Sequence, residues 1–294
     1  MTDSPLPEKG TSGTALGTAF LRALAAHDPR PERRGPDDLA EIFLDDAQRR
    51  AVGDAALRAS AMANQLSPGA YEFMVARTAF FDGLVAQALR DGVPQAVWLG
   101  AGYDSRPYRF RHLLRGTRVF ELDAAPTQQR KQACLSRAGI PVPDLVRFVP
   151  IDFESDDLGQ TLRAAGFDSG QQALFVWEGV TYYLSPGAVD KLLGAVRSLA
   201  PAGSTLCFDY AALSDQALTG GDVKDLRQRM KTQYATEKTR FGIRAGQIET
   251  FLAERGYIIV EHLTAAEMTA RYLTVDGQSD GQVARLFCLA HAAI

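Results

Sequence analysis

The chain has 294 residues, of which 46% are hydrophobic and 23% charged, so it can form one large α/β domain with a sizeable core. The net charge of -3 and the lack of a long Lys/Arg run speak against a nucleic-acid partner, and no apolar run approaches the roughly 20 residues that span a bilayer. The three cysteines are scattered and the four histidines have no neighbour at metal-ligand spacing, so we expect neither disulfides nor a bound metal. The polar residues 1–13 lack the apolar core of a signal peptide, so we expect a cytoplasmic protein.

The beginning of the chain predicts helices and no strands. Residues 1–12 are rich in Pro, Gly, Ser and Thr, which is typical of a disordered tail. Residues 13–90 then predict a helical cap. Its expected helices cover residues 14–27, about 37–64, and 71–90.

From residue 91 onward, short apolar runs alternate with helical stretches. This alternation predicts βαβ units in a doubly wound, mostly parallel, seven-stranded Rossmann-like sheet. We expect a single domain over 13–294, with the sheet core in 91–294 and a helical cap insertion at about 211–250. The expected strands are 96–99, 119–122, 147–150, 174–177, 205–208, 257–260 and 285–290. Such sheets bind ligands at the carboxyl ends of their strands, so functional residues should follow each run directly.

A glycine-rich loop, Gly-Ala-Gly-Tyr-Asp-Ser, occupies residues 100–105 after the first expected strand. Gly100 and Gly102 permit a tight turn and a close approach to a ligand. A dinucleotide-binding loop prefers Gly or Ala where this chain has Ser105, and Asp104 puts a negative charge where a pyrophosphate would lie. S-adenosylmethionine has no phosphate and carries cationic groups, so it suits this acid better. The loop alone is also compatible with a turn that binds no ligand.

Acids also follow the second and third expected strands. Asp123 lies 23 residues beyond Gly100, a spacing at which an acid binds ribose hydroxyls, although it is also compatible with a solvated loop. Glu121 precedes it by two residues, and one of these two acids is compatible with a purely structural role. Asp152 and Phe153 suit adenine, because the carboxylate can accept from the exocyclic amine; the competing use of Asp152 is as a helix N-cap.

Two charged residues are expected in apolar surroundings. Glu178 directly follows four apolar residues, and a buried carboxylate needs a cationic partner, which the cofactor or a protein arginine would supply. Arg77 lies within the apolar stripe of the helix expected at 71–90. Its partner would be the methionine carboxylate of the cofactor, bound by both arms of the guanidinium, or a structural pair with Asp82 or Glu178.

Several segments occur in the order and at the spacing of a known family. They are Arg77 to Asp82, Leu99 to Arg109, Phe120 to Asp123, Trp177 to Leu184, and Arg240 to Tyr257. They resemble the leucine carboxyl methyltransferase family of S-adenosylmethionine-dependent enzymes, including its bacterial small-molecule O-methyltransferase branch. The resemblance covers roughly residues 70–290.

The resemblance implies a class I methyltransferase fold with S-adenosylmethionine as cofactor. By position, Arg77 corresponds to the family arginine that holds the cofactor carboxylate. Gly100 corresponds to the loop glycine, Asp123 to the ribose acid and Glu178 to the acid after the fourth strand.

The resemblance also has two departures. Asp152 and Phe153 correspond to the adenine-side pair, but the family often has Leu where this chain has Phe153. A backbone contact to adenine survives that change. Ser105 stands where Thr is common, which is a mild chemical difference.

The expected function is O-methylation of a small molecule. Methyl transfer requires the acceptor oxygen, the methyl carbon and the sulfur to be aligned and water to be excluded. A carboxylate acceptor needs no general base, whereas a hydroxyl needs one. No His lies in a motif that faces the expected cleft, which favours a carboxylate or an acidic phenol. Tyr182 and Tyr183 are the candidate catalytic residues; they either line the acceptor side or belong to the core.

Three alternative functions stay open from the sequence. One is a nicotinamide-dependent oxidoreductase on a Rossmann fold, which Asp104 and Ser105 disfavour. Another is a protein carboxyl methyltransferase. The last is a protein that binds the cofactor without catalysis.

Overall fold

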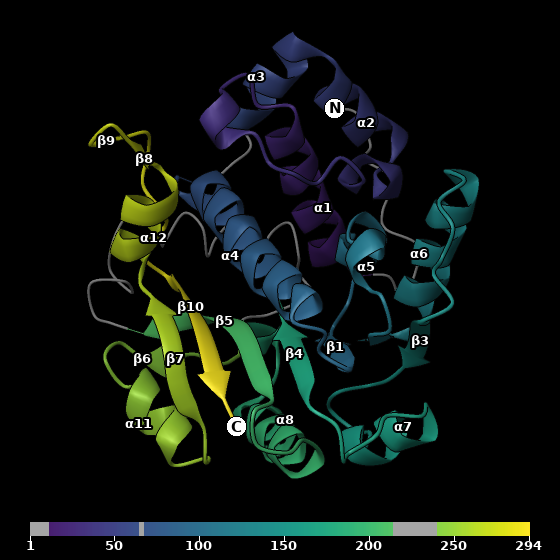
Figure 1. Ribbon diagram of the computed structural model, residues 1–294. Coiled ribbons are helices and arrows are strands. Elements are labelled where there is room, and N and C mark those ends of the chain that lie inside the picture. The colour runs from purple at the N-terminus through teal and green to yellow at the C-terminus, as the bar shows by residue number, and fades with distance from the viewer. Residues whose placement is uncertain (1–11, 65–67, 214–239) are drawn as a thin grey trace.

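The computed structural model describes residues 12–64, 68–213 and 240–294. They form a helical N-terminal part and a central sheet with helices on both faces (Figure 1). The tail expected at 1–12 lies almost entirely outside the described residues. Most of the helical insertion expected at 211–250 also lies outside them.

The N-terminal part is helical, as the sequence predicts. A side-chain cap begins α1, because the Ser12 hydroxyl accepts from the backbone N–H of Ala15 at 3.1 Å. A capping box of Asp45 and Gln48 begins α2. The elements are α1 (Gly13–Ala26), η1 (Pro31–Arg33), η2 (Ala40–Phe43), α2 (Asp46–Gly53), α3 (Ala55–Asn64) and α4 (Ala70–Arg90).

The sheet has the strand order β3-β2-β1-β4-β5-β10-β7, and a short strand, β6, pairs with the end of β5. The first five strands are parallel, whereas β10 is antiparallel to both of its neighbours. The strands are β1 (Gln95–Leu99), β2 (Arg118–Asp123), β3 (Val146–Pro150), β4 (Ala173–Trp177), β5 (Thr205–Leu213), β6 (Ile243–Arg244), β7 (Ile258–Leu263) and β10 (Phe287–Ala293).

All seven expected strands are present, so the predicted fold class is confirmed. Two details differ. The strand expected to end at residue 208 runs on to Leu213, because the chain stays extended and buried through Asp209. The two-residue strand β6 makes the described sheet eight-stranded instead of seven-stranded.

Helices cover both faces of the sheet. The remaining elements are α5 (Arg106–Arg109), η3 (Arg111–Leu113), α6 (Ala125–Arg137), α7 (Leu158–Ala164), η4 (Thr181–Tyr183), α8 (Pro186–Leu199), α11 (Ile248–Ala253), α12 (Ala265–Tyr272), β8 (Thr274–Val275) and β9 (Gln278–Ser279). One core lies between the sheet and α7, α8 and α11, and a second lies between the other face and α4 and α12 (Figure 1). A third joins α1, α2 and η2 to α6. In the described part of the chain, no helix combines the length and apolarity needed to cross a membrane.

A buried ion pair fastens β2 to α6. Lys131 Nζ lies 2.6 Å from Glu121 Oε2, and the Tyr108 hydroxyl donates to Glu121 Oε1 at 3.0 Å. Burial raises the pKa of Glu121, although the charge of Lys131 opposes the shift. Glu121 is therefore the structural member of the two acids in this strand, because its carboxylate faces Lys131 and Tyr108.

Removing the cation alone should destabilise the protein strongly. Lys131→Met leaves the Glu121 carboxylate buried without a counter-charge, which should lower the free energy of unfolding by about 3–5 kcal/mol. The double variant Lys131→Met/Glu121→Leu should recover most of that loss, because no charge stays stranded. Urea unfolding measures both values. A double variant as unstable as the single one would contradict this account.

Candidate active site

A cleft of about 400 Å³ opens at the carboxyl ends of β1, β2, β3 and β4. The chain runs from β1 outward to β2 and β3 on one side and continues through β4 and β5 on the other, so strand order reverses beside β1. Doubly wound sheets bind ligands at this switch point. The cleft is lined by nine of the expected site residues: Arg77, Gly100, Gly102, Asp104, Asp123, Asp152, Phe153, Glu178 and Tyr183.

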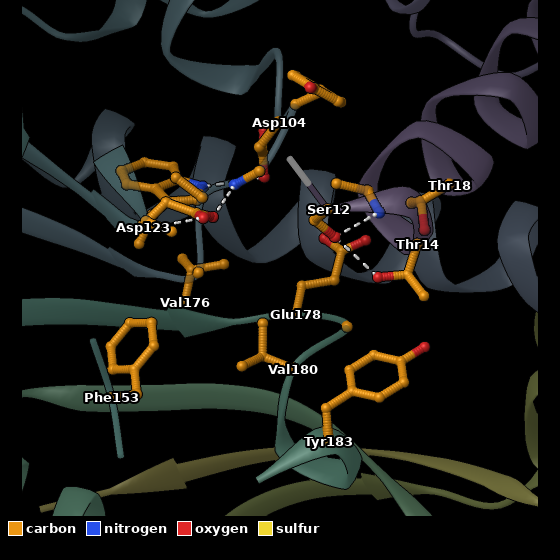
Figure 2. A pocket seen from close by; sticks show the side chains of 18 of the residues that line it. Ser12, Thr14, Thr18, Asp104, Asp123, Phe153, Val176, Glu178, Val180 and Tyr183 are labelled. Atoms are coloured by element: carbon orange, nitrogen blue, oxygen red, sulfur yellow. Dashed lines mark hydrogen bonds between the residues drawn. The ribbon is translucent and has the colours of Figure 1, made fainter. Parts of the chain in front are cut away.

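The glycine loop needs its glycines. Gly100 has a φ of +83°, and a Cβ atom there would overlap with Val180 Cγ2. The backbone N–H of Gly102 donates to Asp123 Oδ2 at 2.7 Å, and the N–H of Ala124 donates to Asp123 Oδ1 at 2.7 Å. Burial raises the pKa of Asp123, whereas these two N–H groups lower it. Asp123 thus ties the loop after β1 to the end of β2, and Figure 2 shows its side chain at the cleft.

Asp104 is held at the cleft by three donors. Its carboxylate accepts from the Trp98 indole N–H at 3.0 Å, from the Arg106 backbone N–H at 2.8 Å and from Arg106 Nη1 at 2.5 Å. Burial alone would raise its pKa, but the charges of Arg106, Arg22 and Lys131, together with the Arg106 backbone N–H, outweigh burial and lower the pKa of Asp104 from 3.8 to about 2. The acid therefore stays ionised at the cleft at any physiological pH.

Arg77 lies between two buried carboxylates. Its Nη1 is 2.9 Å from Asp209 Oδ2, and its Nε is 2.9 Å from Glu178 Oε1. Asp209 also accepts from the backbone N–H of Gly179 at 2.7 Å, and burial raises its pKa against the opposing charge of Arg77. The sequence interpretation missed Asp209. Its signal was its position directly after the expected strand 205–208, where functional residues were anticipated.

Arg106 joins three acids from three elements. Its Nε lies 2.6 Å from Asp82 Oδ1, and its Nη1 lies 2.5 Å from Asp104 Oδ2 and 2.6 Å from Glu178 Oε2. Glu178 therefore has protein arginines as partners, one of the two possibilities that the sequence left open. The possible pair between Arg77 and Asp82 is wrong, because Asp82 is bound by Arg106 and by Arg109.

Asp152 and Phe153 follow β3 and line the cleft, and their adenine-side role stays a prediction. The Asp152 carboxylate accepts from the backbone N–H of Glu154 at 2.9 Å within a turn. The alternative use of Asp152 as a helix N-cap is wrong, because Asp157 caps α7. Phe153 is half-buried, packs against the adjacent core and presents its ring to the cleft (Figure 2).

The two expected catalytic tyrosines point to different places. Tyr183 lines the cleft, where Figure 2 shows its ring beside Val180. Tyr182 is not among the described lining residues. Its hydroxyl lies 3.3 Å from Arg77 Nη1 and 3.4 Å from Asp209 Oδ2, and burial raises the pKa of Tyr182 well above its ordinary value. Tyr182 is thus part of the core, the second of the two roles that the sequence allowed.

The helix α1 forms a wall of the cleft. Thr14, Thr18 and Arg22 recur every four residues, so they share one face of the helix, and all three line the cleft with Ser12 (Figure 2). The sequence interpretation missed these residues. The signal was the spacing of four between polar residues in a helix otherwise rich in Ala and Leu.

The comparison with known families settles the class of protein. Residues 15–197, more than half of the chain, match the family described as "Leucine carboxyl methyltransferase". The chain belongs to the leucine carboxyl methyltransferase family. It is therefore an enzyme that transfers methyl groups from S-adenosylmethionine, and the nicotinamide-dependent alternative is set aside.

Individual relatives agree with the family. A proposed S-adenosyl-L-methionine-dependent methyltransferase of Mycobacterium sp. (strain KMS) is 34% identical over 241 residues, which cover 78% of this chain and 76% of that protein. A relative of the same description from Mycobacterium sp. (strain JLS) is 32% identical and covers 87% of both. A crystal structure of a proposed methyltransferase from Thermobifida fusca YX has a TM-score of 0.60 at 18% identity and covers 99% of both chains, so the fold is shared.

The methyltransferase should not tolerate a side chain at the loop glycine. Gly100→Ala forces a positive φ on alanine and pushes its Cβ into Val180, which should lower the free energy of unfolding by about 1–3 kcal/mol. Gly83→Ala is the matched control: Gly83 is exposed within α4 and has no atom within 4 Å of a built Cβ. That variant should gain up to about 1 kcal/mol. Urea unfolding compares the two, and equal effects would refute the strain at Gly100.

The ion pairs of Arg77 predict that the protein loses stability without this cation. The apolar stripe of α4 by itself would predict no such loss. Arg77→Met leaves Asp209 buried without a counter-charge and leaves Glu178 with Arg106 as its cation, so the free energy of unfolding should fall by about 3–5 kcal/mol without any ligand. The exposed Arg90 lies on the same helix, and Arg90→Met should change stability by less than about 0.5 kcal/mol. Denaturant unfolding measures both variants. A wild-type midpoint for Arg77→Met would show that the two acids do not need this cation.

Proposed function

We propose that this methyltransferase places the methyl group on an oxygen atom of a small molecule, and that a carboxylate is the acceptor best suited to the cleft. One observation carries the proposal. The described residues that line the cleft include no His, Lys or Cys. The site thus offers an acceptor no ordinary general base, and an acceptor that is already anionic needs none.

The described residues fit the cofactor. Arg77 Nε and Glu178 Oε1 are both buried, and neither has a hydrogen-bond partner in the described structure, because their alignment is poor although they are 2.9 Å apart. A carboxylate accepts from the first atom, and a protonated amine donates to the second; the methionine part of S-adenosylmethionine carries both groups. Gly100 leaves room for close backbone approach.

Each end of the cofactor then has candidate partners. Arg77, Glu178 and Asp104 would hold the methionine part, and Asp123 would bind the ribose hydroxyls. Asp152 and Phe153 would flank the adenine. The cofactor supplies an electrophilic methyl group on a sulfonium ion. The protein's own contribution is to orient the acceptor and exclude water, and the α1 face with Thr14 and Thr18 supports that role as a wall.

A hydroxyl acceptor is less well served. Tyr103 and Tyr183 are the described lining residues with a phenolic hydroxyl, and the Tyr103 hydroxyl already accepts from Arg130 Nη1 at 2.9 Å. A phenol is not an ordinary general base near neutral pH. The carboxylates at the cleft already bind Arg77, Arg106 or backbone N–H groups. A phenol with a low pKa stays compatible with the cleft, because it also arrives as an anion.

The size of the cleft supports a small acceptor over a protein. About 400 Å³ must hold the cofactor and the reacting part of the acceptor. A protein C-terminus presents the same carboxylate chemistry, so it is an outcome of the test instead of a second proposal. The net charge of -3 gives no support to a nucleic-acid acceptor.

The test is a titration followed by an acceptor panel. S-adenosylhomocysteine should bind in calorimetry and NAD should not. The panel pairs each carboxylic acid with its alcohol and its amine, and each peptide with its C-terminally amidated form. Mass spectrometry should find methylation of the acids, as esters that alkali cleaves. The rate should be flat above about pH 6, because carboxylic acids are then ionised. Methylation of the alcohols, or of the peptides alone, would contradict the proposal.

A further inference from the structure

Asp37 lies outside the cleft, yet its carboxylate binds Ser105 of the glycine loop. It belongs to the connection between η1 and η2, is only 1% exposed, and is not among the described lining residues of the cleft. Its Oδ2 accepts from Arg22 Nε at 2.8 Å, and its Oδ1 accepts from the Ser105 hydroxyl at 2.6 Å. One carboxylate of the N-terminal cap therefore binds both the α1 wall and the glycine loop.

The two contacts of Asp37 converge on both sides of Asp104. Arg22, whose Nε binds Asp37, donates from Nη2 to the carbonyl oxygen of Tyr103 at 2.6 Å. Ser105, which donates to Asp37, follows Asp104 directly in the chain. The backbone is thus held at the residue before and the residue after the acid that lines the cleft.

The side chains around Asp37 are buried and make further contacts with one another, which hold them in place. Ser105 Oγ also accepts from Arg109 Nε at 2.9 Å, and the same Nε lies 3.4 Å from Asp37. Arg109 binds Asp82 at 2.9 Å, and Asp82 binds Arg106. The chain of contacts from the cap therefore reaches the acids of the cleft by a second route.

We infer that Asp37 is a positioning residue for cofactor binding: it couples the seating of the N-terminal cap to the placement of Asp104. The inference rests on the proposed cofactor site, in which Asp104 holds the methionine part. Asp37 touches no bound group itself and acts through Arg22 and Ser105. The cap is then a component of the cofactor site as well as a cover over it.

The chain offers a matched control in Asp28. It is also 1% exposed and lies in the same cap, where it binds Arg30 Nη2 at 2.7 Å and accepts from the Tyr71 hydroxyl at 2.7 Å. None of its side-chain contacts in the described structure reaches the glycine loop. Asp28→Asn thus weakens the seating of the cap on α4 and leaves the loop contacts in place.

The experiment titrates S-adenosylhomocysteine into the full chain by calorimetry. In Asp37→Asn the side-chain NH₂ group cannot accept a hydrogen bond, so either Arg22 Nε or the Ser105 hydroxyl loses its acceptor. Arg22 also loses its counter-charge. The dissociation constant should rise about tenfold, against less than about threefold for Asp28→Asn. Hydrogen exchange at residues 100–106 should become faster in Asp37→Asn only. Asp37→Asn combined with Asp104→Asn should weaken binding by less than the product of the single effects.

Further variants keep the outcomes separate. Ser105→Ala cuts one route without stranding a charge, so it tests the inference even if Asp37→Asn does not fold; it should weaken binding by a few-fold. Equal effects of Asp37→Asn and Asp28→Asn, or unchanged loop exchange, would overturn the positioning role. Asp123→Ala reports on the site itself. If Asp123→Ala weakens binding and Asp37→Asn does not, the inference alone fails; if the wild type does not bind, the proposed cofactor site fails with it.

Discussion

Compensation of buried charge is the constraint on which this site depends. A carboxylate taken out of water costs several kcal/mol unless a cation and hydrogen bonds replace the solvent. Arg106 meets that requirement for three acids at once, because its planar guanidinium presents several donors in fixed directions. Its contacts with Asp82, Asp104 and Glu178 join α4, the glycine loop and the end of β4. If the loop moved away with Arg106, Asp82 and Glu178 would each lose one of their cations.

At the cleft, the acids come from strand ends and the loops after them and the arginines come from helices, although Asp82 of α4 also binds Arg106. The strands β2, β4 and β5 bring carboxylates to or near one edge of the sheet, whereas the arginines come from helices that pack across that edge. Arg77 comes from α4, Arg106 from α5 and Arg22 from α1. A cofactor that carries both a cation and a carboxylate can enter such a mixed field and find a partner for each group. The same mixture of charges is unfavourable for a pyrophosphate, because a pyrophosphate carries only negative charge and the acids repel it.

Much of the fold was predictable from the sequence, because each buried strand is a short apolar run. Such a run can be recognised from a few consecutive residues. The end of β5 was not predictable, since Asp209 interrupts its apolar run with a charge that Arg77, Gly179 and Tyr182 compensate from other parts of the fold. In the same way, Glu178 could be recognised as an acid in need of a cation. Which arginine supplies that cation is decided by packing across the sheet, and sequence spacing carries no record of it. Tyr182 and Tyr183 show the limit again, because adjacent residues of one turn face the core and the cleft.

The contacts that build the cleft also join distant parts of the chain. Arg77 and Asp209 are 132 residues apart, and Arg22 and Tyr103 are 81 residues apart. Closing loops of this length costs entropy before any contact repays it, so contacts of this kind form slowly. A growing chain that has produced only α1 to β4 has the glycine loop and the cap but lacks Glu178 and Asp209, the two acids that bind Arg77. The cleft is therefore a product of the finished fold, and it matures only after the later strands have joined the sheet.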